Sequence, residues 1–355
     1  MEGQNRHSGG LIRTGDFGTF VKTILMRHLT ILVPDGQSDL STLASIIGAY
    51  EIFARANKYK KENGEKEVFK IELAGISKRT EFDQGIVNIK PQTHISAITK
   101  THLIIVPPSL IRNYEKAEKG NRLMIDWIAK RYKSGAEIAS ICTGAFILAS
   151  AGLLEGRNCS THWASEGAFR KFFPNVKLHP EKLITDEKGI YTNGGGYSFL
   201  NLVIYLIEKY FDRETAIFCS KIFQIEMDRQ SQSAFSIFTG QKQHGDEMVM
   251  EAQTYIESML HEKISVEHMC ARFSVGRRNF DRRFIKATGN TPLEYSQRVK
   301  IESAKKSFET CRKTINEVMY EVGYSDVKAF REVFKKITGM SPLEYRSRYN
   351  KEAFA

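Results

Sequence analysis

An eight-residue stretch occurs twice near the end of this chain, fifty residues apart. TGNTPLEY fills residues 288–295 and TGMSPLEY fills residues 338–345. In each copy one phenylalanine lies four residues before the Thr-Gly pair and another lies eight before it: Phe284 and Phe280 in the first copy, and their counterparts in the second. This spacing predicts two copies of one short helical unit, and therefore an all-α carboxyl-terminal domain with an internal repeat.

Each copy has the pattern of two helices joined by a tight turn. In the first copy Ser265 caps a helix, and after a Gly-containing turn a second helix runs over 277–287, with Gly289 as its left-handed end. In the second copy Gly323 supplies the turn and Ser325 caps the helix that follows. The copies align at a spacing of 49 before the turn and 50 after it, which predicts one extra residue at the start of the later second helix.

The second helix of each copy is basic. Residues 272–286 hold six basic residues and one acid. A basic helix of about 10 residues after a tight turn is typical of a recognition helix that enters the major groove of double-stranded DNA. In such a helix Arg and Asn read base edges, whereas Lys and a capping Ser hold phosphates. The candidate contacts are Arg277, Arg278, Asn279, Arg282 and Arg283 in the first copy, and Ser325, Lys328, Arg331 and Lys335 in the second. The alternative is a structural helical domain with a solvated basic face.

The region from about 250 to 350 resembles the AraC/XylS-type DNA-binding domain. The resemblance rests on Ser265, Arg278, Phe280, Arg282 and Phe284, and on Gly323, Tyr324, Ser325, Phe330, Phe334, Gly339, Pro342 and Tyr345. The chain departs from the family at Gly276, where a capping Ser is usual, and at Glu332, where Arg is usual. The resemblance implies a tandem helix-turn-helix that binds an operator at sites about 10 bp apart. A homodimer and contact with RNA polymerase are further expectations.

The amino-terminal two thirds alternate between strand-like and helix-like segments. This alternation predicts an α/β domain, a parallel sheet with helices on both faces. The expected strands are 29–33, 69–74, 103–106 and 137–141, and the expected helices are 40–59, 123–132, 146–154, 198–210 and 212–226. The predicted organisation is a disordered tail over 1–25, with Met26 as an alternative start, a sensor domain over 26–227, a polar linker over 228–246 and the DNA-binding domain over 247–355.

The sequence SICTGA, residues 140–145, is the most distinctive part of the amino-terminal region. A strand there enters a tight turn with small residues on both sides of Cys142 and continues into a helix, as in a nucleophile elbow. Ligands of open α/β sheets bind outside the carboxyl ends of the strands. We therefore expect an effector pocket at that edge, formed by Asp39, Pro108, Cys142, Thr143, His162 and Gly195.

Residues 27–226 resemble the class I glutamine amidotransferase-like superfamily, the ThiJ/PfpI group, as found fused to AraC-type domains. The matching stretches are LVPDGQSDL, SICTGAFILASAGLLEGR, STHWA and YTNGGGYSFLNLVIYLIE. Hydrolases of this superfamily place a His directly after the elbow Cys, a position that Thr143 takes here. His162 is the candidate base and Asp39 the candidate acid, but no triad is complete.

Cys142 therefore has three interpretations: a structural cysteine, a part of the effector pocket, or a catalytic nucleophile. We expect a regulator without enzyme activity. The rivals are a cysteine-dependent hydrolase or glyoxalase-like enzyme with a DNA-binding appendage, and an architectural DNA-binding protein with a degenerate amino-terminal domain. Thiol reactivity separates the first rival from a sensor, and a ligand-dependent thermal shift separates the second.

Composition sets the remaining limits. The net charge of +11 favours a polyanionic partner. Five scattered cysteines favour a reducing cytoplasm, and the Cys and His residues show no paired spacing typical of metal ligands. The sequence has no apolar run long enough for a membrane span, no signal peptide and no phosphate-binding Gly loop with its Lys and Ser/Thr. We expect no metal and no cofactor.

Overall fold

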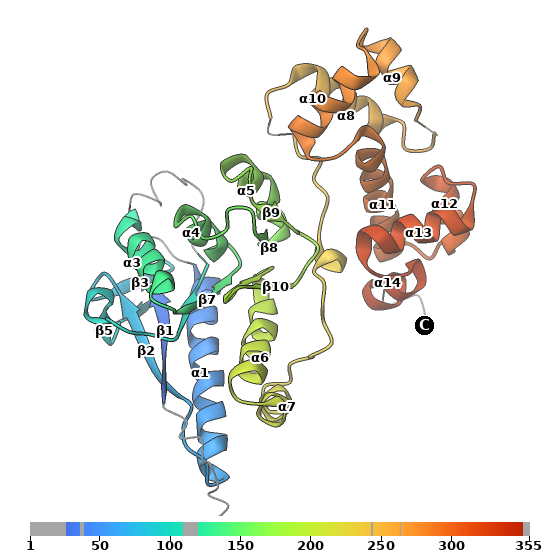
Figure 1. The fold of residues 1–355 in the computed structure, drawn as a ribbon. Coiled ribbons are helices and arrows are strands. Elements are labelled where there is room, and N and C mark those ends of the chain that lie inside the picture. The colour runs from blue at the N-terminus through green and yellow to red at the C-terminus, as the bar shows by residue number, and fades with distance from the viewer. Residues whose placement is uncertain (1–25, 36–38, 109–119, 243, 263, 351–355) are drawn as a thin grey trace, which may run out of the picture.

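The structure, a computed structural model, describes residues 26–35, 39–108, 120–242, 244–262 and 264–350. The expectations for residues 1–25 lie outside this range. The chain forms an α/β body at the amino-terminal end and a helical body at the carboxyl-terminal end, with an irregular segment between them (Figure 1). In the described part of the chain, no helix is both long and apolar enough to cross a bilayer.

A seven-stranded sheet forms the centre of the α/β body, in the order β10-β11-β7-β6-β1-β2-β5. Neighbouring strands are parallel except β10, which is antiparallel to β11. The predicted parallel sheet is confirmed for six of its strands. The antiparallel edge strand β10 was not predicted, because its four residues show no apolar alternation. The strands are β1 Arg27–Val33, β2 Phe69–Gly75, β5 Thr93–His94, β6 Leu103–Val106, β7 Glu137–Ile141, β10 Ile184–Glu187 and β11 Ile190–Asn193. Two small pairs lie outside the sheet: β3 Thr80–Phe82 with β4 Val87–Ile89, and β8 Asn158–Cys159 with β9 Lys177–Leu178.

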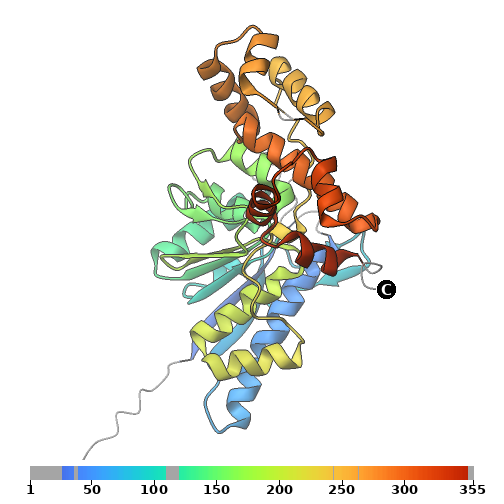
Figure 2. The ribbon, with the colours of Figure 1, turned by 90° about the vertical axis from the view of Figure 1, so that its right-hand side faces the viewer.

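Helices cover both faces of the sheet. Side chains of β6 alternate between two cores, since Leu103 and Ile105 pack with one set of helices and Ile104 and Val106 with the other. The first set is α1 Leu40–Glu62, α6 Phe199–Tyr210 and α7 Arg213–Ile222, and the second is α3 Arg122–Lys133, α4 Gly144–Ser150 and α5 Glu166–Phe172. Figure 2 shows α1, α6 and α7 side by side.

The helix predicted over 146–154 begins earlier and ends at Ser150. Gly152 adopts a φ of 72°, and the N–H of Leu153 donates to the carbonyl of Leu148 at 3.0 Å. This is a left-handed helix end. It terminates the helix before the predicted boundary, although the residues beyond it are apolar. The early start matters more, because it brings α4 directly to the elbow.

Seven helices form the described part of the helical body, and one of them belongs to both of its cores. The first core contains Phe280, Phe284 and Tyr295, and the second contains Phe308 and Phe334. The helix α11 contributes Tyr295 to one and Phe308 to the other, so one continuous helix joins the two units. The helices are α8 Glu247–Ser258, α9 Val266–Arg272, α10 Arg277–Thr288, α11 Pro292–Thr310, α12 Ile315–Glu321, α13 Val327–Thr338 and α14 Pro342–Tyr349.

The aromatic packing repeats from one unit to the next, as the sequence predicts. The rings of Phe284 and Tyr295 are 5.4 Å apart at an interplanar angle of 78°. Those of Phe334 and Tyr345 are 5.5 Å apart at 78°. Two edge-to-face pairs of the same geometry, fifty residues apart, show that the repeat in the sequence is a repeat in the structure.

The prediction that Ser325 caps the second recognition helix is wrong. The N-cap of α13 is Asp326, whose carboxylate accepts a hydrogen bond from the N–H of Ala329 at 2.8 Å. Asp and Ser are nearly equivalent caps, so the local sequence offered two starting points. As a consequence α10 and α13 have the same length, twelve residues, and the extra residue of the second copy lies in the turn before α13.

Candidate nucleic-acid interface and elbow site

The helices α10 and α13 present their predicted contact residues to solvent in equivalent ways. Each buries two phenylalanines and a threonine against its own unit and ends at a left-handed glycine. The opposite face is open and carries Arg278, Asn279 and Arg282 on α10, and Lys328, Arg331 and Lys335 on α13. Ser325 is exposed in the turn before α13. The structure therefore displays two similar polar faces, both mainly cationic.

Two of the predicted arginines on α10 are already engaged by carboxylates. The guanidinium of Arg283 makes two hydrogen bonds to Asp246, at 2.9 and 2.6 Å, and lies half-buried beside the start of α8. Asp246 is also the N-cap of α8, and the ion pair with Arg283 holds its pKa below its usual range. Arg277 pairs with Asp281 at 2.8 Å and with Glu267. The sequence does not distinguish between the five polar residues of this helix. In the structure Arg277 and Arg283 are bound to carboxylates, whereas Arg282 donates to the amide oxygen of Asn279 at 2.9 Å and stays exposed.

Cys142 occupies a strained backbone position at the end of β7. Its φ of 56° lies in the left-handed region, which is uncommon for a residue with a side chain. A Cβ on Gly144 would lie 2.6 Å from the carbonyl oxygen of Val106, and one on Gly195 would lie 2.5 Å from Sγ of Cys142. Glycine is therefore required at both positions, by the backbone of Val106 at Gly144 and by Cys142 itself at Gly195. The turn has the geometry of an elbow.

The surroundings of Cys142 favour the neutral thiol. Burial raises the pKa of Cys142, and the charge of Asp39 acts in the same direction. The N–H groups of Gly196 and Thr143 donate toward the sulfur and oppose this shift, but burial is the larger effect. A catalytic thiolate needs the reverse balance.

The other predicted pocket residues meet at the same edge of the sheet. Asp39 caps α1 by accepting the N–H of Thr42 at 3.0 Å, and the hydroxyl of Thr42 donates to the carbonyl of Pro108 at 3.3 Å. Burial alone would raise the pKa of Asp39, but hydrogen bonds from Ser41 and Thr42 hold it below its ordinary value. A charged carboxylate thus lies within electrostatic reach of the elbow.

His162 lies near the elbow without bonding to its sulfur. Nδ1 of His162 accepts the N–H of Ala164 at 3.2 Å, and burial lowers the pKa of the ring. The hydroxyl of the preceding residue, Thr161, donates to the carbonyl of Cys142 at 2.9 Å. Among the described residues no hydrogen bond joins His162 to the thiol of Cys142, so the structure brings the predicted base close but does not assemble a nucleophile–base pair.

Alkylation of Cys142 by iodoacetamide at neutral pH is expected to be slower than alkylation of the same residue in denatured chain by about tenfold or more, because a raised pKa reduces the thiolate fraction. The rate should rise through the alkaline range. Peptide mapping by mass spectrometry follows Cys142 apart from the other cysteines, and the denatured chain is its matched control. A folded-state rate above the denatured rate at neutral pH would instead indicate an activated nucleophile.

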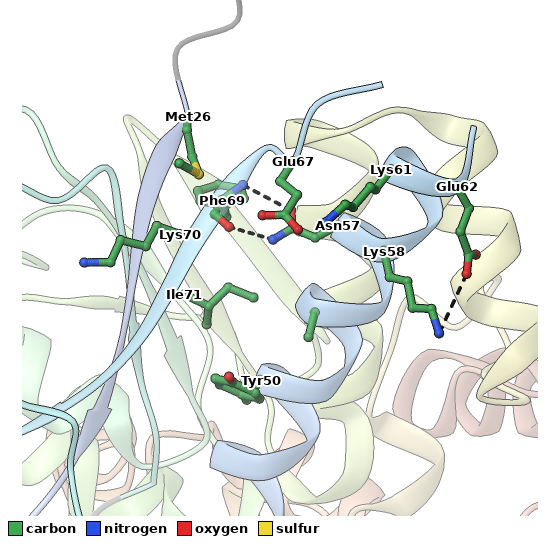
Figure 3. Close-up of a pocket in the computed structure, with 11 residues that line it drawn as sticks. Met26, Tyr50, Asn57, Lys58, Lys61, Glu62, Glu67, Phe69, Lys70 and Ile71 are labelled. Carbon is green, nitrogen blue, oxygen red and sulfur yellow. Dashed lines mark hydrogen bonds and ion pairs between the residues drawn. The ribbon is translucent and has the colours of Figure 1, made fainter. Parts of the chain in front are cut away.

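Two grooves of the described residues lie away from the elbow. One, of about 760 Å³, lies between α1 and β2 and includes Tyr50, Asn57, Lys61 and Ile71 (Figure 3). Another, of about 670 Å³, lies between α6 and residues 227–231. None of the predicted pocket residues lines either groove, so the prediction for the elbow rests on the convergence of its side chains.

Two residues with clear structural roles were not predicted. Asp246 directly precedes a helix with an acid in its first turn, which is a recognisable cap signal in the sequence. Gln232 lies in the segment that leads to the helical body, and its side chain is buried against the elbow region. No local pattern in the polar segment around it distinguishes this glutamine from its exposed neighbours, so its position is visible only in the structure.

Comparisons with known proteins agree with both bodies. Residues 64–204 match the DJ-1/PfpI family, and residues 269–348 match a helix-turn-helix domain family. The HTH-type transcriptional regulator GbdR of Pseudomonas aeruginosa is 25% identical over 226 residues, which cover 62% of this chain and 60% of GbdR. The HTH-type transcriptional regulator GlxA of Rhizobium meliloti is 25% identical, with 60% of this chain and 66% of GlxA covered.

Among solved structures, an AraC family transcriptional regulator from Pseudomonas putida is 18% identical and covers 56% of this chain and all of its own, with a TM-score of 0.44. The chain spans about 60% of the length of GbdR. The two family matches include the elbow and the recognition helices. The chain thus combines an AraC-type helix-turn-helix domain with a DJ-1/PfpI-type, glutamine amidotransferase-like domain.

Proposed function

We propose that the protein is a sequence-specific DNA-binding transcription regulator whose amino-terminal domain binds a small-molecule effector. The observation that carries this proposal is the pair of twelve-residue helices, α10 and α13, with equivalent buried cores and open cationic faces. Each face has the size and charge to enter a major groove. The rigid connection through α11 fixes the spacing of the two helices, which suits two groove segments on one side of a duplex.

The residues of each recognition helix have distinct roles in this proposal. Arg278, Asn279 and Arg282 face the groove from α10, and Lys328, Arg331 and Lys335 face it from α13, with Ser325 beside the backbone. Arg277 and Arg283 lie at the margin, where their carboxylate partners shape the helix surface. Phosphate contacts from the lysines would contribute affinity, and the arginines and Asn279 would contribute most of the sequence preference.

The effector site of this proposal is the elbow. Asp39, Pro108, Cys142, Thr143, His162 and Gly195 surround the carboxyl ends of the central strands, where open α/β sheets bind ligands. The raised pKa of Cys142 and the separate hydrogen bond of His162 support binding rather than catalysis. The relatives compared above are named as regulators, in agreement with a non-enzymatic role.

The domain limits and partners complete the proposal. The sensor domain extends over 26–227 and the DNA-binding domain over 247–355, with residues 228–246 between them. The protein acts as a homodimer in the cytoplasm, where its operator DNA lies, and RNA polymerase is its further partner. Cofactors and metals have no role in it.

Selection of bound sequences from a random double-stranded DNA library tests the proposed function. The full-length protein is expected to enrich sites with two preferred blocks about 10 bp apart, since each recognition helix reads one groove segment. The control is the same selection with Arg282→Ala combined with Arg331→Ala, which should lose the preference. If the protein retains DNA from the library but no sequence is enriched, the proposal of sequence-specific binding is contradicted.

A further inference from the structure

The segment between the two bodies is an ordered strap, defined here as residues 230–238. Its first residues add to the edge of the α/β body, because the N–H of Leu183 donates to the carbonyl of Gln230 at 3.1 Å and the N–H of Gln232 donates to the carbonyl of Glu181 at 3.0 Å. Lys182 and Ser231 form an antiparallel bridge between these bonds. Figure 1 shows the strap, in yellow, passing from β10 to the helical body. Because the strap is fixed to the α/β body by backbone hydrogen bonds, a displacement in that body can move the strap.

The side chain of Gln232 fixes the strap to the elbow region. It is 3% exposed, and its Nε2 donates to the carbonyl of Thr161 at 2.8 Å while its Oε1 accepts the N–H of Trp163 at 3.3 Å. It packs against Gly194, on which a Cβ would lie 2.6 Å from the carboxamide carbon. Gly194 directly precedes Gly195, which touches Cys142. A displacement of the glycine turn by about one ångström therefore cannot leave Gln232 in place, because packed interiors have no free volume to absorb it.

The other half of the strap is bound to the second helix-turn-helix unit. The hydroxyl of Tyr349 donates to the carbonyl of Ala234 at 3.2 Å, and Nζ of Lys305 donates to the carbonyl of Ser236 at 2.5 Å. Phe235 lies between two guanidinium groups, with Arg229 at 4.0 Å and Arg348 at 5.0 Å from its ring centre. These contacts join the strap to α11 and α14.

The strap also reaches the end of the second recognition helix. Gly339, the left-handed C-cap of α13, lies against Ser231 and Ser233, since a Cβ there would be 3.9 Å from side-chain atoms of both. The short 3₁₀ turn Ser233–Phe235 packs against α13. The strap thus supports the carboxyl-terminal end of α13, while Lys328 lies at the opposite, amino-terminal end.

The first recognition helix meets the α/β body in a corresponding place. A Cβ on Gly289, the C-cap of α10, would lie 3.8 Å from Cδ of Arg170 on α5. Arg170 is held by Glu166 at 3.0 Å and by the carbonyl of Leu178 at 3.3 Å. The helix α5 follows the turn that begins at Thr161, which is the residue that bonds both Cys142 and Gln232. The C-cap of each recognition helix therefore rests on a segment connected to the elbow.

We propose that Gln232 couples the elbow site to the second recognition helix, so that a ligand seated against Cys142 and Gly195 changes the orientation of α13 through the strap. This inference rests on the proposed function, because it concerns the regulation of the same elbow site. In one arrangement the carboxamide of Gln232 is inserted beside the glycine turn, and in the other it is withdrawn. A ligand at the elbow would favour one of these two arrangements. Gln232 acts as a positioning residue and touches no DNA.

Hydrogen–deuterium exchange on the full-length protein tests the coupling without effector or DNA. Gly195→Ala serves as the perturbation, since the added methyl group must displace Cys142. We expect exchange in the strap and in the last turn of α13 to be about tenfold faster in this variant. In a Gln232→Ala background the same perturbation should add nothing at these remote sites. Gln230→Ala, an exposed glutamine two residues earlier, is the matched control and should preserve the remote response.

Two outcomes overturn the proposal. In the first, the effect of Gly195→Ala stays within residues 140–146 and 193–199 in every background. In the second, the remote response remains at full size without the Gln232 side chain. If Gly195→Ala prevents folding, Cys142→Ala replaces it, because that change removes the sulfur without adding an atom. Since neither DNA nor effector enters the readout, failure here leaves the library selection unaffected, and failure of the selection leaves the exchange result unaffected.

Discussion

Arg278→Ala and Arg282→Ala should each weaken binding to the selected duplex by about 5- to 150-fold, the loss expected when one arginine contact to a base edge, about 1–3 kcal/mol, is removed. Both guanidinium groups lie on the open face of α10, and the core of that helix is formed by Phe280 and Phe284 on the other side. The fold should therefore be unaffected. Fluorescence anisotropy with a labelled duplex at fixed salt measures the change.

A charge-matched variant separates a specific contact from a general loss of positive charge. Arg122→Ala removes one exposed arginine from the α/β body and should change the affinity little. Removal of an arginine that holds only a phosphate would weaken binding to the selected and the scrambled duplex alike. Removal of an arginine that reads a base would instead lower the ratio of the two affinities. Full affinity in both α10 variants would exclude this helix from the interface.

Phe284→Ala should destabilise the first helix-turn-helix unit by about 3–5 kcal/mol, the usual cost of removing a buried phenylalanine. The ring is fully buried and packs edge-to-face on Tyr295. Ile285→Ala, the next residue on the same helix and 45% exposed, is the matched control and should cost far less.

The distribution of tryptophan makes this measurement selective. Both tryptophans, Trp127 and Trp163, lie in the α/β body, so their fluorescence reports the unfolding of that body. Far-UV circular dichroism reports helix loss from the whole chain. In urea the helix signal of Phe284→Ala should begin to fall at lower denaturant while the tryptophan transition is unchanged. A shift of both transitions together would show that the two bodies unfold as one unit.

The repeat explains why so much of the helical body could be predicted from sequence. Phenylalanines at a spacing of four and glycines at the helix ends specify a local structure that tertiary packing does not alter, and both C-caps are left-handed as expected. The start of α13 could not be fixed, because Ser325 and Asp326 are both good caps and packing chooses between them. The pairing of Arg283 with Asp246 could not be predicted either, because it joins α10 to the residue that caps α8.

The elbow was recognisable because its small residues stand together in the local sequence, and the close approach of the carbonyl of Val106 requires glycine at position 144. The role of Gln232 was not, because its partners come from distant loops at Thr161 and Trp163. The segment around it is polar and lacks long helices or strands, which is why its sequence resembles that of a plain linker. Long-range hydrogen bonds of this kind leave no periodicity in the sequence.

The most direct test of the account is the affinity of the full-length protein for the selected duplex after about five base pairs, roughly half a helical turn, are inserted between its two blocks. Because α11 belongs to both cores, α10 and α13 cannot rotate independently to follow the displaced block. We predict that specific affinity falls to that of a duplex carrying one block alone, and that an insertion of a full turn does not restore it. Unchanged affinity for the half-turn duplex would contradict the proposal that α10 and α13 bind two major-groove segments as one rigid unit.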